Sequence, residues 1–227
     1  MKSRALSNYA CKVTMAVTGL LFAGFVLAHM IGNLKVYQGA DAFNAYAAWL
    51  REVGYPLLPR EGVLWALRVV LGLALVAHIG CGIALWLRGR AARGSFRRRG
   101  RSPKAWAATL MVPSGLLLLA FIIVHLLDLT LGTLGAPAFR HPDASGFHAY
   151  DNLVASFQRP GYAVFYLVVM LVLALHLAQG LWSALHDLGG TAGRLRRVWV
   201  AVAGVAVIAI TVVNSSIPLA VMMGWLT

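Results

Sequence analysis

The chain has 227 residues, of which 60% are hydrophobic and only 12% are charged. A soluble domain carries about twice that charged fraction, so these values exclude a globular domain with a water-facing surface. The formal net charge of +13 does not indicate a nucleic-acid-binding protein. The basic residues lie between apolar runs, where Lys and Arg set topology and contact lipid headgroups. Cys11 and Cys81 are too few for a disulfide framework, and no Cys-x-x-Cys-His motif for covalent c-type haem is present.

Five apolar segments are each long enough to cross a bilayer, which takes about 20 residues in a helix. We interpret the first as a retained helix rather than a signal peptide, because no clear small-residue cleavage site ends it. The sequence therefore predicts an all-α integral membrane protein of five transmembrane helices in a single domain over residues 1–227, with no apparent tandem repeat. The predicted helices cover residues 13–34, 63–87, 105–134, 162–185 and 198–226.

Two of the connecting segments are more than simple linkers. Between the first and second spans, residues 41–51 place Phe43, Tyr46 and Leu50 at helical spacing. This pattern predicts an amphipathic helix that lies in the membrane interface. Residues 148–157, ahead of the fourth span, are expected to form a similar element.

Segments rich in Lys and Arg alternate with poor ones along the chain, which predicts the orientation. The rich segments are the N-terminus, the second connection and the fourth connection, with Lys2, Arg4 and Lys12; Arg88, Arg90, Arg93, Arg97, Arg98, Arg99, Arg101 and Lys104; and Arg194, Arg196 and Arg197. The poor ones carry Lys35, Arg51 and Arg60, and Arg140 and Arg159. We therefore expect the N-terminus in the cytoplasm and the C-terminus outside.

Four of the seven histidines lie inside apolar spans. An imidazole in a span is costly unless it is satisfied, so each is a functional candidate by default. Counting about 1.5 Å of rise per residue from the flanking charges places His29 and His125 in the outer half of the bilayer. The same count places His78 and His176 in the inner half. The other three histidines are expected to be solvated: His141, His148 and His186.

Two histidine pairs at two depths match the axial ligation of two stacked haems, because haem iron in electron-transfer cytochromes takes two ligands from opposite sides of a flat ring. A zinc site fits less well, since its ligands must converge on one point. A proton relay would need Asp or Glu, which the spans nearly lack. Glycines near the histidines suit a flat porphyrin, although ordinary helix packing also favours them: Gly19, Gly24, Gly72, Gly80, Gly82, Gly115 and Gly180.

At these residues the chain resembles the five-helix, two-haem cytochrome b membrane subunit of succinate dehydrogenase and fumarate reductase. The resemblance covers nearly the whole chain, with its segments in order. They are HMIGNLKVYQG with FNAYAAWL (29–39 and 43–50), LVAHIGCG (75–82), FIIVHLLDLTLG (121–132) and YDNLVASFQRPGYAVFYLVVMLVLALHLAQGLWSALHDLG (150–189).

The resemblance implies a membrane anchor in the bacterial inner membrane, with a flavoprotein subunit and an iron–sulfur subunit bound on the cytoplasmic side. It implies two haem b groups, the outer one held by His29 and His125 and the inner one by His78 and His176. Electrons from succinate would pass through iron–sulfur clusters and haems to a membrane quinone. An outer haem favours menaquinone. This chain would be the electron-transfer subunit of the enzyme and would not bind succinate itself.

Polar residues near the two ends of the predicted bundle are candidates for holding haem propionates. Arg4, Ser7 and Lys12 lie at the inner face. Arg68 lies within the second span near the outer face. Its side chain could bind a propionate or a quinone, pair with Asp128, or extend to the headgroups.

Quinone candidates lie around the outer histidines. Asp128 follows His125 by three residues, so it lies near the same helix face and could protonate a quinone, although an acid at a helix end is more often solvated. The other candidates follow His29: Asn33, Lys35, Tyr37 and Gln38. Inside the bundle, three residues are expected mainly to bond between helices: Ser114, Gln179 and Ser183.

Three hypotheses from different classes remain at this point. The first is the two-haem electron-transfer subunit. The second is a haem-free membrane anchor whose histidines only cross-link helices, which a visible spectrum would distinguish from the first. The third is a small transporter, which predicts broken helices, internal repeats and midplane polar groups that the sequence does not display.

Overall fold

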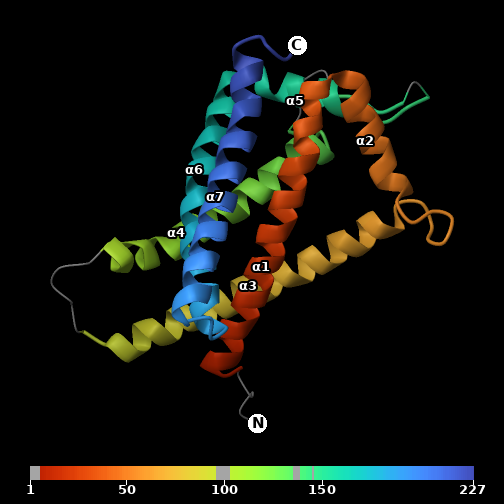
Figure 1. Ribbon diagram of the computed structural model, residues 1–227. Coiled ribbons are helices and arrows are strands. Elements are labelled where there is room, and N and C mark those ends of the chain that lie inside the picture. The colour runs from red at the N-terminus through yellow and green to blue at the C-terminus, as the bar shows by residue number, and fades with distance from the viewer. Residues whose placement is uncertain (1–5, 96–102, 135–138, 145) are drawn as a thin grey trace.

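The computed structural model describes residues 6–95, 103–134, 139–144 and 146–227. Within these ranges the regular secondary structure is helical and no strand is formed, which confirms the all-α prediction. In chain order the elements are α1 (Asn8–Asn33), the 3-10 helix η1 (Leu34–Gln38), α2 (Ala40–Glu52), α3 (Gly62–Arg93), α4 (Pro103–His125), the π-helix η2 (Leu126–Thr130), α5 (Ala149–Phe157), α6 (Pro160–Asp187) and α7 (Gly193–Met222) (Figure 1).

Five helical stretches are long and apolar enough to cross a membrane, as predicted. They are Asn8–Gln38, Gly62–Arg93, Trp106–Thr130, Pro160–Asp187 and Gly193–Met222. The fifth helix ends at Met222, four residues earlier than expected, because Gly224 takes a φ of 72°, a conformation that commonly ends helices. The third span stops at residue 130 rather than 134.

The two predicted amphipathic elements are confirmed as α2 and α5. Gly39, with a φ of 93°, lets the chain turn sharply from η1 into α2. Both short helices lie at the end of the molecule that also carries the C-terminus, and we call this the α2/α5 end (Figure 1). The start of α1 lies at the opposite end (Figure 1).

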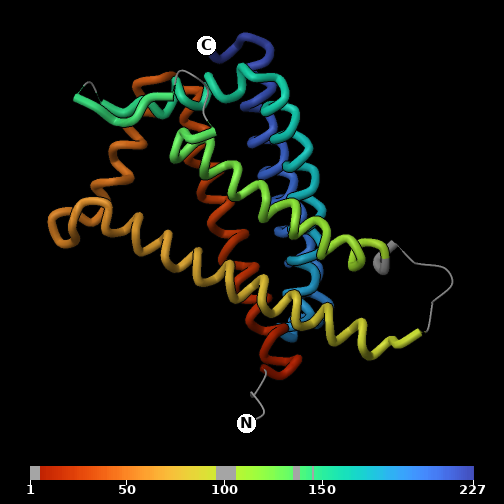
Figure 2. The backbone as a smooth tube through the Cα atoms, turned by 180° about the vertical axis from the view of Figure 1, so that it is seen from behind, coloured from red at the N-terminus to blue at the C-terminus, as the bar shows by residue number. Residues whose placement is uncertain are grey.

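The helix α6 is the centre of the packing. It contacts α1, α4 and α7, while α3 packs against α1. The helices α3 and α4 are inclined to α1, α6 and α7 in both views of the backbone (Figures 1 and 2). Little or none of the apolar stretch of α3 or α4 is buried, as expected for spans whose outer surface meets lipid.

An apolar cluster closes the α2/α5 end. Its buried residues come from η1, α5, α6 and α7 and from the segment after α7, so the cluster packs these elements together at this end. The cluster consists of Val36, Tyr150, Leu153, Val154, Phe157, Tyr166, Ile217, Ala220, Val221 and Leu226.

Candidate haem-binding site

The four histidines of the spans come together as two pairs. The rings of His29 on α1 and His125 on α4 have centroids 5.9 Å apart, near the α2/α5 end. The rings of His78 on α3 and His176 on α6 have centroids 6.5 Å apart, further towards the N-terminal end. We call these the outer pair and the inner pair. Each pair thus draws one histidine from each half of the chain.

Both spacings fit one metal ion held between two imidazoles. With about 2 Å for each metal–nitrogen bond, two rings on opposite sides of an ion have centres roughly 6 Å apart. The helix pairs that share histidines, α1–α4 and α3–α6, are not among the closely packed pairs. A haem bound between two histidines needs such a gap between the helices that carry them, because the flat ring lies between the two imidazoles. Among the described residues, no three His, Cys, Asp or Glu side chains gather as a metal site.

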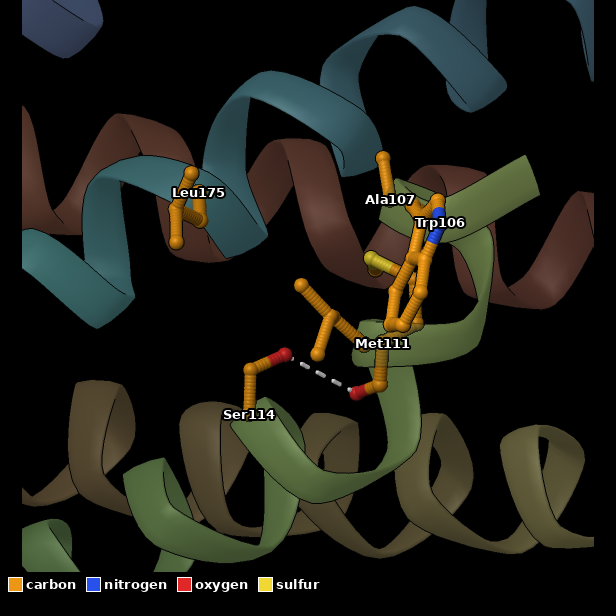
Figure 3. Close-up of a pocket in the computed structure, with 6 residues that line it drawn as sticks. Trp106, Ala107, Met111, Ser114 and Leu175 are labelled. Atoms are coloured by element: carbon orange, nitrogen blue, oxygen red, sulfur yellow. Dashed lines mark hydrogen bonds between the residues drawn. The ribbon is translucent and has the colours of Figure 1, made fainter. Parts of the chain in front are cut away.

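The inner pair is held by hydroxyl groups. His78 Nδ1 lies 2.9 Å from Thr18 Oγ1, and His176 Nδ1 lies 2.9 Å from Ser114 Oγ. These bonds engage Nδ1 and leave the other ring nitrogen, Nε2, for a ligand. Beside Ser114, an apolar cavity of about 290 Å³ opens between α4 and α6 (Figure 3). It is lined by Trp106, Ala107, Leu110, Met111, Ser114 and Leu175.

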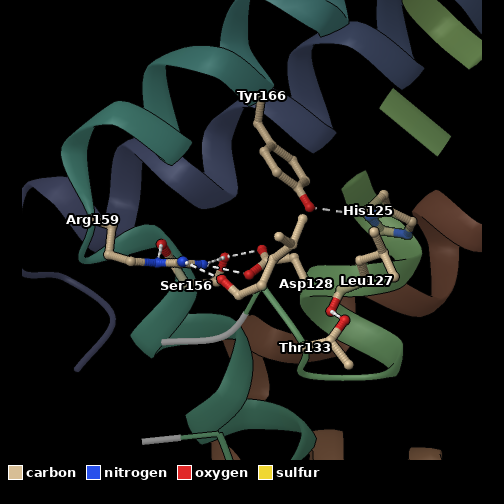
Figure 4. Close-up of polar contacts among 8 residues, drawn as sticks. His125, Leu127, Asp128, Thr133, Ser156, Arg159 and Tyr166 are labelled. Atoms are coloured by element: carbon tan, nitrogen blue, oxygen red, sulfur yellow. Dashed lines mark hydrogen bonds and ion pairs between the residues drawn. The ribbon is translucent and has the colours of Figure 1, made fainter. Parts of the chain in front are cut away.

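The outer pair is held mainly by aromatic rings. Phe25 stacks on His29 with centroids 5.6 Å apart and an interplanar angle of 16°. Phe121 lies 5.5 Å from His125 on the same helix. The Tyr166 hydroxyl from α6 approaches His125 Nδ1 at 3.3 Å (Figure 4). The two outer histidines therefore have different surroundings.

A buried ion pair lies next to the outer pair. Asp128, in the π-helix that directly follows His125, is only 1% exposed. Its carboxylate accepts hydrogen bonds from the Ser156 hydroxyl and the Arg159 guanidinium (Figure 4). The expectation of a solvated Asp128 is wrong, because the π-helix turns the side chain inward against α5. Insertions of this kind in α-helices frequently mark functional sites.

One of the roles weighed for Arg68, pairing with Asp128, is not formed. Asp128 is paired with Arg159, which sequence reasoning had counted only as an outer-loop charge. Arg68 lies exposed on α3, with its guanidinium 4.8 Å from the centre of the Trp65 ring. The propionate, quinone and headgroup roles of Arg68 stay predictions.

The candidates at the inner face have partners of their own. Ser7 caps α1 by accepting a hydrogen bond from the Ala10 amide. Lys12 forms an ion pair with Asp187 at 3.2 Å, which joins α1 to the end of α6. Arg4 lies outside the described residues. A propionate role for these three residues remains a prediction.

The quinone candidates that follow His29 face a different neighbour from Asp128. Asn33 donates a hydrogen bond to Asn214 at 3.2 Å. Two further contacts tie the same stretch down: the Tyr37 hydroxyl lies 2.6 Å from that of Ser216, and Lys35 lies over the Tyr46 ring. Gln38 is exposed.

Asn33 and Tyr37 therefore contact α7, whereas Asp128 contacts α5 and the residue before α6. The structure does not join the quinone candidates through shared contacts. Their role in quinone binding stays a prediction.

Several site residues were missed or misjudged from the sequence. Thr18, Ser156, Arg159 and Tyr166 were not singled out as site residues, because a polar residue near a helix end or within a span carries no periodic signal. His148 was expected to be solvated, and this is wrong. Its side chain is 9% exposed, and its Nε2 lies 3.2 Å from a carboxylate oxygen of Asp143.

Comparison with known proteins gives one informative match. The succinate dehydrogenase cytochrome b558 subunit of Bacillus subtilis (strain 168) is 26% identical over 160 residues, which cover 70% of this chain and 69% of that subunit. No protein-family model matches the chain, and no solved structure matches it. The chain is thus similar to a succinate dehydrogenase cytochrome b subunit over 70% of its length, and five of its helices are long and apolar enough to cross a membrane.

Proposed function

We propose that this chain is the membrane-anchor cytochrome b subunit of a succinate:quinone oxidoreductase, respiratory complex II, and that it binds two b haems. In this role it passes electrons between an iron–sulfur subunit and a membrane quinone. Succinate itself is handled by a separate flavoprotein subunit. The similarity to the Bacillus subtilis subunit supports the complex, and the histidine geometry supports the two haems.

The observation that carries the proposal is the pair of ring separations, 5.9 Å and 6.5 Å, at two levels of one helix bundle. Histidines that only cross-linked helices would not need a second imidazole opposite the ring. Here each ring instead faces another imidazole across a separation suited to a shared iron. Nδ1 engagement of His78 and His176 orients those rings further.

Bound haem supplies one-electron transfer between two sites within the membrane. The residues of this chain hold and tune that chemistry. Two imidazoles would hold the haem at each of the two levels, and the apolar spans exclude water from it. At the outer level, the Tyr166 hydroxyl and the Asp128–Arg159 pair provide groups that can hold or move a proton near His125.

The orientation in the proposal follows the Lys and Arg distribution. The N-terminus and the arginine-rich connection between α3 and α4 face the cytoplasm of a bacterial inner membrane, and the α2/α5 end faces outward. The soluble subunits dock at the cytoplasmic face. Quinone, with menaquinone favoured, binds near the outer pair, where Asp128, Asn33 and Tyr37 are the polar candidates.

Purification of the intact complex from its own membrane tests the proposal. A flavoprotein and an iron–sulfur subunit should copurify with this chain, and succinate should reduce added quinone. His29→Ala should abolish quinone reduction while succinate-to-dye electron transfer by the soluble subunits survives. His186→Ala, a matched α6 control whose ring bonds the Trp182 carbonyl at 2.8 Å, should leave both activities intact. A chain that purifies without redox subunits contradicts the proposal.

A further inference from the structure

The two helices that carry the outer histidines share a sequence pattern that the apolar periodicity hides. Each has a hydroxyl residue directly followed by a glycine. Five residues then separate the glycine from a phenylalanine, and three residues separate the phenylalanine from the histidine. The members are Thr18, Gly19, Phe25 and His29 on α1, and Ser114, Gly115, Phe121 and His125 on α4. Every spacing is the same in the two helices.

The helices that carry the inner histidines repeat each other as well. In α3 and α6, histidine is followed four residues later by glycine: His78 and Gly82, and His176 and Gly180. A short Phe-x-Ala-Tyr sequence lies between the spans in both halves, beginning at Phe43 and at Phe147. The two halves of the chain thus place these residues at matching positions along corresponding spans.

The hydroxyl residues of this pattern, Thr18 and Ser114, each bond to a carbonyl of their own helix and to a histidine of another helix. Thr18 Oγ1 donates its proton to the Thr14 carbonyl at 2.7 Å, and Ser114 Oγ donates to the Met111 carbonyl at 3.1 Å (Figure 3). A hydroxyl has one proton to donate. Each oxygen must therefore accept from its histidine, which requires the proton of His78 and of His176 to sit on Nδ1.

The glycines that follow the two hydroxyl residues, Gly19 and Gly115, lie against the inner histidines. A Cβ atom added at Gly19 would lie 3.6 Å from His78 Cε1, and one added at Gly115 would lie 3.4 Å from His176 Cε1. Each inner ring therefore lies against the backbone of an outer-pair helix, beside the hydroxyl that binds it. The helices that carry the outer pair thus hold the inner pair in place.

We propose that Thr18 and Ser114 are a matched pair of positioning residues, which fix the Nδ1–H form of His78 and His176 and aim both Nε2 atoms at the inner haem iron. This inference rests on the proposed function. Hydrogen-bond acceptors behind a ligating histidine orient the ring and raise its basicity. A more basic imidazole stabilises oxidised iron, so the two hydroxyls lower the reduction potential of the inner haem and leave the outer one unaffected.

The test is a redox titration of both haems in the intact complex, with haem spectra and electron paramagnetic resonance for each centre. Thr18→Val and Ser114→Ala remove the acceptors, while Thr18→Ser and Ser114→Thr retain them. Thr211→Val is the control, because that hydroxyl donates to the Val207 carbonyl of α7 at 2.8 Å. Loss of a supporting partner commonly weakens metal binding by about 10- to 100-fold, so haem retention is measured alongside.

We expect the inner-haem potential to rise in Thr18→Val and in Ser114→Ala, to rise further in the double variant, and to return in the conservative variants. Selective loss of the inner haem, reversed by Thr18→Ser, also supports the inference. Two haems with unshifted potentials in the double variant overturn this inference alone. A wild-type complex without haem overturns the proposed function and this inference together.

Discussion

At the scale of single residues, the candidate site consists of polar side chains that lie within apolar spans and bond across helices. The four span histidines stood out because an imidazole in apolar surroundings needs a reason. Thr18 and Ser114 could not stand out in the same way, since a hydroxyl in a helix readily bonds its own backbone. Asp128 was misjudged because its burial depends on a π-helix and on Arg159, which lies far along the chain.

The buried pair of Asp128 and Arg159 gives a residue-scale prediction. Asp128→Asn should lower the free energy of unfolding by about 2 kcal/mol, because Arg159 loses its partner but keeps partial access to water. Thermal unfolding in detergent, followed by circular dichroism, measures the change. Glu52→Gln breaks an exposed pair with Arg60 and should cost under about 1 kcal/mol. Equal losses in the two variants would contradict the structural role of Asp128.

At the scale of elements, length and hydropathy were sufficient to predict five spans and the two short amphipathic helices. The exact ends were not predictable from apolar runs, since caps and left-handed glycines set them. Ser7 begins α1 because its hydroxyl oxygen accepts a hydrogen bond from the Ala10 amide, and Gly224 ends α7 with its left-handed φ; neither signal is one of hydropathy. The matched spacings of the two halves do not appear in the hydropathy pattern, because they involve only a few residues of each span.

The junction of α1 and α2 supplies an element-scale prediction. A Cβ atom added at the buried Gly32 would lie 2.5 Å from Tyr46 Oη, so the Tyr46 side chain on α2 would have to move. Gly32→Ala should destabilise the protein by about 1–3 kcal/mol through overpacking.

Two further variants sharpen that measurement. Gly89→Ala, at an exposed site with open space, should be neutral or stabilising by up to about 1 kcal/mol. Combining Gly32→Ala with Tyr46→Leu should cost less than the sum of the two single variants. Strict additivity of those variants would mean that the two residues do not meet.

At the scale of the whole molecule, the alternation of basic segments predicts the membrane orientation, and the helix bundle predicts two stacked sites. The inclination of α3 and α4 and the central place of α6 could not be read from the sequence, because they arise from contacts between distant segments. The pairing of the histidines, in contrast, could be predicted from their depth in the membrane, because the position of a residue within a span fixes how far along the membrane normal it lies.

Orientation is tested by cysteine labelling in intact cells. The native cysteines, Cys11 and Cys81, are buried, so background labelling should be low. Trp225→Cys, near the C-terminus, should react with a membrane-impermeant maleimide without permeabilisation. Ser95→Cys, beyond the end of α3, should react only after the cells are opened. The reverse pattern would invert the orientation and place the outer pair at the cytoplasmic face.

The most direct test of the account is the haem content per chain, measured from dithionite-reduced minus oxidised visible spectra of the purified complex. The account predicts two b haems in the wild type. It predicts one in His29→Ala and one in His78→Ala, with a spectroscopically different haem remaining in each variant. A folded and assembled wild-type complex without haem, or two variants that lose the same haem, would contradict the paired-histidine arrangement.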